Sequence, residues 1–147
     1  MIDTISLGWL HEAVSWLMVP ALVTLLVACA IALVEAGIAV GERFHGLPKL
    51  RAGGDVALVQ SLARHRLERA DLLARIPPML GLMATIIPLG PGLAALGKGD
   101  PAQLASAVTV AFDATVLGLV AGIAGLVIGK LRRRWYEETL DAMELPA

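Results

Sequence analysis

A run of apolar residues between Leu104 and Gly129, LASAVTVAFDATVLGLVAGIAGLVIG, decides the fold class of this chain. About 20 such residues cross the hydrocarbon of a bilayer as an α-helix, because each residue advances the helix by about 1.5 Å. Asp113 is the one charged residue in the run. We therefore predict a membrane-spanning helix over 104–130. We also expect a specific role for Asp113, since burying a carboxylate in hydrocarbon costs about 2.5–3.5 kcal/mol on insertion scales.

Two more stretches are long enough to cross a bilayer. The first, over 13–41, has no charged residue between Ala13 and Val34. The second, over 77–97, is uncharged but rich in proline and glycine. Interior prolines are tolerated in membrane helices, so this stretch fits a kinked span, with a re-entrant segment as the alternative. The fold class predicted from the three stretches is an all-α integral membrane protein with three transmembrane helices, forming a single membrane domain over 1–147.

The composition supports the membrane assignment and argues against several functions. The 147 residues are 57% hydrophobic and 17% charged, which is too apolar for an ordinary soluble domain. A single cysteine cannot form a disulfide or a thiolate metal site within the chain. Aromatic residues are too few for a base-stacking surface, and no histidine lies inside a span, where a haem-binding anchor would need one. We expect a protein that is not an enzyme, with no cofactor, metal or nucleic-acid partner.

The positions of the basic residues predict the orientation. Of the 12 lysines and arginines, seven lie between the first and second spans and four follow the third, which leaves only Lys98 between the second and third. Positively charged loops remain on the cytoplasmic side of a membrane. The N-terminus is therefore expected outside and the C-terminus inside, in a multi-pass protein of the inner membrane.

The loop between the first two spans is expected to contain a cytoplasmic amphipathic helix over about 55–75. Asp55 has the side chain of an N-cap. Apolar residues then recur at 4-4-3-4 spacing, with arginines and glutamates between them, as on one face of a helix. These apolar residues are Val59, Ala63, Leu67, Ala70 and Ala74. Such a helix would lie on a neighbour or continue the second span into the cytoplasm.

Two acidic residues at the end of one span and a proline inside another are candidates for contacts with neighbouring residues or chains. Glu35 and Glu42, at the inner end of the first span, are seven residues apart and share one helix face. Glu35 is expected to be interfacial, paired with Arg43 or with a partner protein. Pro88, which interrupts the second span, is a further candidate for a partner or interface contact.

Small residues form a continuous stripe along the third span. They are Ala111, Thr115, Gly118, Gly122, Gly125 and Gly129, spaced 4-3-4-3-4. Such stripes allow helix backbones to approach closely within a membrane, so we expect a packing seam. Asp113 lies about 200° round the helix from Thr115 and therefore points away from this seam. Its carboxyl either carries protons or faces a partner, or else it fixes the helix register by bonding to Thr24 or Thr109.

The second and third spans resemble the MotA/TolQ/ExbB proton-channel family. The resemblance rests on PPMLGLMATIIPLGPGLAAL, over 77–96, and GDPAQLASAVTVAFDATVLGLVAGIAGLVIGKLRRR, over 99–134. The family signature of the second span corresponds here to Pro78, Gly81, Leu82, Ala84 and Thr85, with alanine in place of a glycine. That of the third span corresponds to Ala111, Phe112, Thr115, Gly118 and Leu119. One branch of the family has an acidic residue in the third span at the position that is Val110 here. Asp113 would take the place of that acidic residue from a different face of the helix.

The resemblance implies a homopentameric ring around a single-span, ExbD/TolR/MotB-like partner that carries a proton-accepting aspartate. Thr85 and Thr115 would line the ring interior near that aspartate. Gly81 would lie where the helices pack together. Proton flow down the membrane potential would then drive transport or mechanical work. The alternative is a non-conducting assembly or anchor subunit of a larger complex, for which the stripe of small residues alone would suffice.

Overall fold

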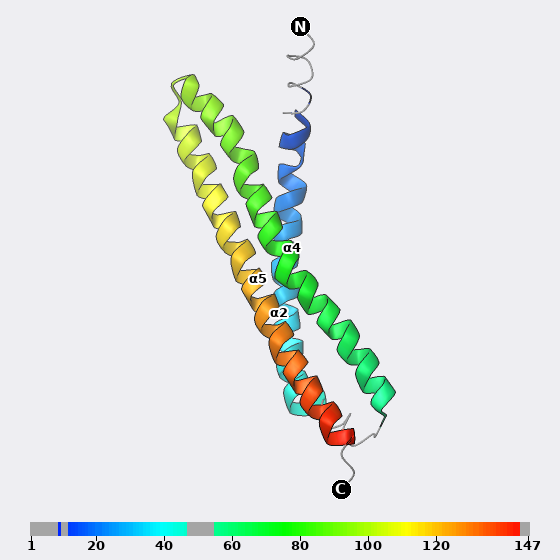
Figure 1. Cartoon of the computed structure of the whole chain (residues 1–147). Coiled ribbons are helices and arrows are strands. Elements are labelled where there is room, and N and C mark those ends of the chain that lie inside the picture. Colours follow the sequence, from blue (N-terminus) through cyan, green and yellow to red (C-terminus); the bar gives the residue numbers. More distant parts are fainter. Residues whose placement is uncertain (1–8, 10–11, 47–54, 145–147) are drawn as a thin grey trace. The chain divides into compact units, whose positions relative to one another are not determined.

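The computed structural model describes Trp9, residues 12–46 and residues 55–144 (Figure 1). Within these ranges all regular structure is helical: α2 (Met18–Gly41), the π-helical turn η1 (Glu42–Gly46), α4 (Val56–Gly97) and α5 (Pro101–Glu144). Three helical stretches are long and apolar enough to cross a membrane, namely Glu12–Phe44, Val56–Gly97 and Pro101–Met143. The all-helical class and the presence of three helices able to span a membrane are thus confirmed, whereas the orientation and the ring remain predictions.

Helix α4 joins the predicted amphipathic segment and the second span in one element. Asp55 caps its start, because the Leu58 amide donates to Asp55 Oδ1 at 3.0 Å. Four prolines lie inside the helix, at 77, 78, 88 and 91. Each removes one backbone hydrogen bond, yet the segment over 77–97 is helical throughout. The re-entrant alternative therefore does not describe it.

A tight turn connects α4 to α5. Gly99 has a φ of 85°, a conformation that favours glycine, and the Asp100 amide reaches back to the Ala95 carbonyl at 3.0 Å. Asp100 then caps α5 by accepting a hydrogen bond from the Gln103 amide at 3.1 Å, and Pro101 occupies the first position of the helix. Local sequence is thus enough to reverse the chain between these two helices.

The chain divides into two compact units. The first unit comprises Met1–Cys29 with Ile76–Val120, and the second comprises Ala30–Arg75 with Ala121–Ala147. In the first unit, Leu25 of α2, Ala84 of α4 and Ala114 of α5 pack into one buried cluster. In the second unit, one cluster contains Val59, Ala63 and Tyr136, and another contains Ala39, Ala70 and Ile128.

Glycines bring α4 and α5 into close backbone contact within each unit. In the first unit, a Cβ on Gly118 would lie 2.6 Å from the Pro77 carbonyl oxygen, and one on Gly81 would lie 3.0 Å from that of Ala114. In the second unit, a Cβ on Gly125 would lie 2.6 Å from the Ala74 nitrogen. A side chain at Gly118 or Gly125 would force the two helices apart, and one at Gly81 would be tight. The stripe of small residues on α5 therefore packs against α4, as such a stripe allows in membranes.

The other two glycines of the stripe also lie on the covered side of α5. Gly122 is buried, and a Cβ on Gly129 would lie 3.4 Å from that of Ala70, which is close to ordinary contact. The opposite side of α5 carries exposed large apolar residues, among them Phe112, Val116 and Ile123. A helix with one packed side and one exposed apolar side is what a membrane environment permits.

Candidate functional site

Two threonine hydroxyls meet between α4 and α5 in the first unit. Thr85 Oγ1 and Thr115 Oγ1 are in direct hydrogen-bond contact, and both side chains are half-buried. Thr85 lies one turn beyond Gly81 and Thr115 one turn before Gly118. The close approach at Gly81 and Gly118 is what brings the two hydroxyls within reach of each other.

The hydroxyl pair has more acceptors than protons to donate. Thr85 Oγ1 can donate to the Gly81 carbonyl at 2.8 Å or to the Ala111 carbonyl at 3.2 Å. Thr115 Oγ1 can donate to the same Ala111 carbonyl at 3.1 Å. A hydroxyl donates one proton and accepts at two lone pairs, so either threonine can act as donor or acceptor toward the other. The donor and acceptor roles can therefore exchange by rotation of the hydroxyl hydrogens alone.

Asp113 lies apart from this pair. Its side chain is exposed on α5, on a different face from Thr115. Among the described residues it accepts no hydrogen bond from Thr24 or Thr109: Thr24 Oγ1 donates to the Pro20 carbonyl at 2.6 Å, and Thr109 Oγ1 to that of Ala105 at 3.0 Å. The bond that would fix helix register within one chain is thus absent from the described part of the protomer.

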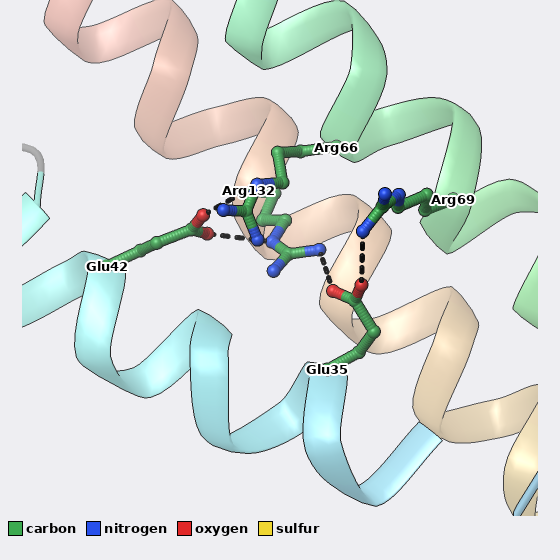
Figure 2. A network of polar contacts seen from close by, with 5 residues as sticks. All are labelled: Glu35, Glu42, Arg66, Arg69 and Arg132. Carbon is green, nitrogen blue, oxygen red and sulfur yellow. Dashed lines mark hydrogen bonds and ion pairs between the residues drawn. The ribbon is translucent and has the colours of Figure 1, made fainter. Parts of the chain in front are cut away.

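A network of charged side chains joins all three helices in the second unit (Figure 2). Arg132 of α5 lies at its centre, donating from Nη1 to Glu35 Oε2 at 2.7 Å and from Nε to Glu42 Oε2 at 2.9 Å. From α4, Arg69 approaches Glu35 at 3.7 Å and Arg66 approaches Glu42 at 3.2 Å. Glu35 and Glu42 therefore share a face, as their spacing predicted, and both bind the same guanidinium.

The network is deeply buried at its centre. The Arg132 side chain is 0% exposed, with Glu35 at 6% and Glu42 at 15%. Three arginines and two carboxylates leave one positive charge uncompensated within the group. Arg132 Nη2 has no hydrogen-bond partner among the described residues. Buried charges remain ionised only when they are paired, so the arginine and the two glutamates depend on one another.

Arg43 takes a different partner from the one expected. The sequence predicted that Glu35 pairs with Arg43 or with a partner protein. Instead Glu35 binds Arg132 and Arg69, while Arg43 lies 4.0 Å from Glu138 and 5.2 Å from the centre of the Trp135 ring. The Arg43 pairing was wrong because Glu35 is held on the side of α2 that faces the other helices.

Tyr136 packs beside the network, beyond the apolar stretch that ends at Gly129. Burial raises the pKa of its phenol above the ordinary value of 10.0, and the charge of Glu42 raises it further. Arg66 and Arg132 act on this pKa in the opposite direction. The neutral phenol is the form that suits this buried position.

Sequence reasoning identified Thr85 and Thr115 but missed Arg132. That residue is one of several arginines after the third span, and nothing in their spacing distinguishes the buried one. Pro88, a candidate for a partner contact, is buried within the first unit. No three His, Cys, Asp or Glu side chains come together as a metal site in the part of the chain that the structure describes.

Comparison with models of known protein families identifies a family. The model of the MotA/TolQ/ExbB proton channel family matches residues 54–145. This range contains α4 and α5, whereas α2 lies outside it. No curated protein and no solved structure matches the chain.

Proposed function

Because the chain belongs to the MotA/TolQ/ExbB proton channel family, we propose that it is the proton-conducting subunit of an energiser complex in the inner membrane. Copies of the chain assemble as a pentameric ring around a single-span, ExbD/TolR/MotB-like partner. Proton flow past the partner drives transport or mechanical work elsewhere. One elementary charge crossing 100 mV releases about 2.3 kcal/mol, so several protons are needed for each working step.

The contact between Thr85 and Thr115 carries this proposal. The two hydroxyls come from antiparallel family helices, lie half-buried, and share the Ala111 carbonyl as an acceptor. Such a pair can pass a hydrogen bond along without holding a charge, which suits a position next to a partner's carboxylate. Neither threonine needs a net charge in the membrane, where charges are costly.

The test is proton flux through the complex purified from its native membrane and reconstituted into vesicles. A potassium gradient with valinomycin sets the membrane potential, and a pH-sensitive dye inside the vesicles reports proton entry. Thr115→Val is expected to abolish the flux while leaving the assembly intact, because valine keeps the shape but cannot relay a hydrogen bond. The stability loss should be small, since interhelical hydrogen bonds in membranes average about 0.6 kcal/mol.

Thr115→Ser is the matched control, because it retains the hydroxyl and should retain flux. Unchanged flux in Thr115→Val would contradict the relay role of the pair. An intact wild-type complex that passes no protons would favour the alternative, a non-conducting assembly or anchor subunit.

A further inference from the structure

Three polar side chains of the first unit, Thr24, Thr85 and Asp113, lie at one level. Leu25, Ala84 and Ala114 pack in a single cluster, which sets the three helices in register at that point. Thr24 and Asp113 each directly precede a member of this cluster, and Thr85 directly follows one. One turn further along α2 and α5, Cys29 Sγ lies 3.7 Å from the Leu117 carbonyl oxygen, so these two helices run in the same direction. Thr24 and Asp113 are therefore at equal height.

Within one protomer these two side chains lie on different sides. Cys29 faces α5, and Thr24 is about 140° round the helix from it, so Thr24 points away from α5. Asp113 lies about 200° from Thr115, which packs on α4. Both Thr24 and Asp113 are exposed. One protomer thus has the Thr24 hydroxyl on one side of its surface and the Asp113 carboxyl, at the same height, on another side.

A carboxyl at this depth needs a polar partner that lipid does not provide. The apolar stretches 13–34, 77–97 and 104–129 contain no lysine or arginine, so another copy of the chain cannot provide a cation there. It can provide the Thr24 hydroxyl. That hydroxyl retains acceptor lone pairs while donating to Pro20, and by rotating it can instead donate to a carboxylate.

The arrangement fits a ring. A closed ring with one kind of contact joins two different faces of each subunit, head to tail. The flank of α2 that points away from its own α5 is the one that can meet the α5 of the next copy. We infer that Thr24 of one copy hydrogen-bonds Asp113 of its neighbour, and that this contact joins consecutive subunits at the polar level. The inference rests on the ring of the proposed function and adds the residues that close it.

Disulfide cross-linking in the native membrane tests this contact. Cys29→Ala removes the native thiol from the full-length chain, and Thr24→Cys is combined with Asp113→Cys. Oxidation should produce a ladder of covalent multimers on a non-reducing gel, because a hydrogen bond between the two side chains brings their Cβ atoms close to the roughly 3.5–4.5 Å that a disulfide spans. Each single cysteine should produce no ladder.

Ile31→Cys with Asp113→Cys is the matched control. Ile31 is exposed on the same face of α2 but lies about 10 Å further along the helix, too far for a disulfide. Equal ladders from this pair and from the Thr24 pair would overturn the inference. So would links formed by Asp113→Cys alone, or a link from it to a different protein.

Native mass spectrometry separates this inference from the proposed function. An intact ring without the Thr24–Asp113 ladder overturns the contact and leaves the proposed function standing. A monomeric wild-type chain overturns both. A ladder without proton flux overturns only conduction.

A second measurement tests the contact without introducing cysteines. Thr24→Val should lower the temperature at which the ring dissociates, and Thr24→Ser should not. In an Asp113→Leu background, Thr24→Val should cause no further loss. An equal loss from Thr24→Val in both backgrounds would overturn the contact.

Discussion

The two units of this protein use polar side chains in different ways. In the described ranges every ion pair lies in the second unit, where Arg132 binds the carboxylates of Glu35 and Glu42. The first unit is held by close backbone contact at Gly81 and Gly118, and its central polar groups are the hydroxyls of Thr85 and Thr115.

This difference suits the polar groups of the two units to different tasks. A buried ion pair cannot give up one partner without leaving the other charge unpaired, so it suits a fixed joint. Hydroxyls exchange donor and acceptor roles at little cost, so they suit a relay. Glu35 belongs to α2 and Glu42 to the turn η1, both outside the family match, and the arginines they bind belong to α4 and α5. In the second unit the network therefore joins α2 and η1 to the two helices of the family match, beside the apolar cluster that contains Ala39.

The largest effect is expected from removing the centre of the network. Arg132→Leu leaves two buried carboxylates without their common partner, which should destabilise the protein by about 3–5 kcal/mol. Thermal unfolding in detergent, followed by circular dichroism, measures the change. Arg133→Leu, at an exposed neighbour, should have almost no effect.

Replacing Arg132 together with both of its carboxylate partners tests this prediction further. Glu35→Leu, Glu42→Leu and Arg132→Leu together should restore much of the lost stability, because no buried charge is then left unpaired. If Arg132→Leu alone unfolded at the wild-type temperature, the second unit would not depend on its charges, and the contrast between the units would disappear.

A smaller effect is expected from the glycine contact of the first unit. Gly118→Ala places a Cβ 2.6 Å from the Pro77 carbonyl oxygen, so α4 and α5 must separate, at a cost of about 1–3 kcal/mol. Gly37→Ala is the matched control, because a Cβ there meets nothing within 4 Å and alanine favours a helix. The unfolding temperature should fall for Gly118→Ala and rise for Gly37→Ala. A fall of equal size in both would show that the close contact at Gly118 is not what holds the unit.

The smallest effect concerns Tyr136, the only tyrosine in the chain. Its pKa is raised by burial and by Glu42, so the folded protein favours the neutral phenol. The resulting stability is present below pH 10, the ordinary value, and is lost as the pH rises through the raised pKa. Absorbance of tyrosinate should show a titration midpoint above 10 in the folded protein and near 10 in denaturant. Equal midpoints would place Tyr136 in solvent.

Much of the fold was predictable because it depends on local properties of the sequence. Long apolar runs specified the spans, Asp55 marked the start of α4, and the spacing of glycines on the third span indicated its packed face. The family motifs indicated Thr85 and Thr115 as candidate site residues. The expected pairing of Glu35 with Arg43 was wrong because charge partners depend on which residues meet across three helices, and sequence proximity does not decide that.

The sequence alone determined the helices, their membrane character and the faces of α5, because hydropathy and helical periodicity act within a few turns of chain. Only the tertiary structure decided that Arg132, among its neighbouring arginines, is the buried one, and that Thr85 touches Thr115. It also decided that Thr24 and Asp113 share a height without meeting in one protomer. These facts depend on the rotation and register of each helix against the others, which are set by side-chain packing between segments far apart in the chain.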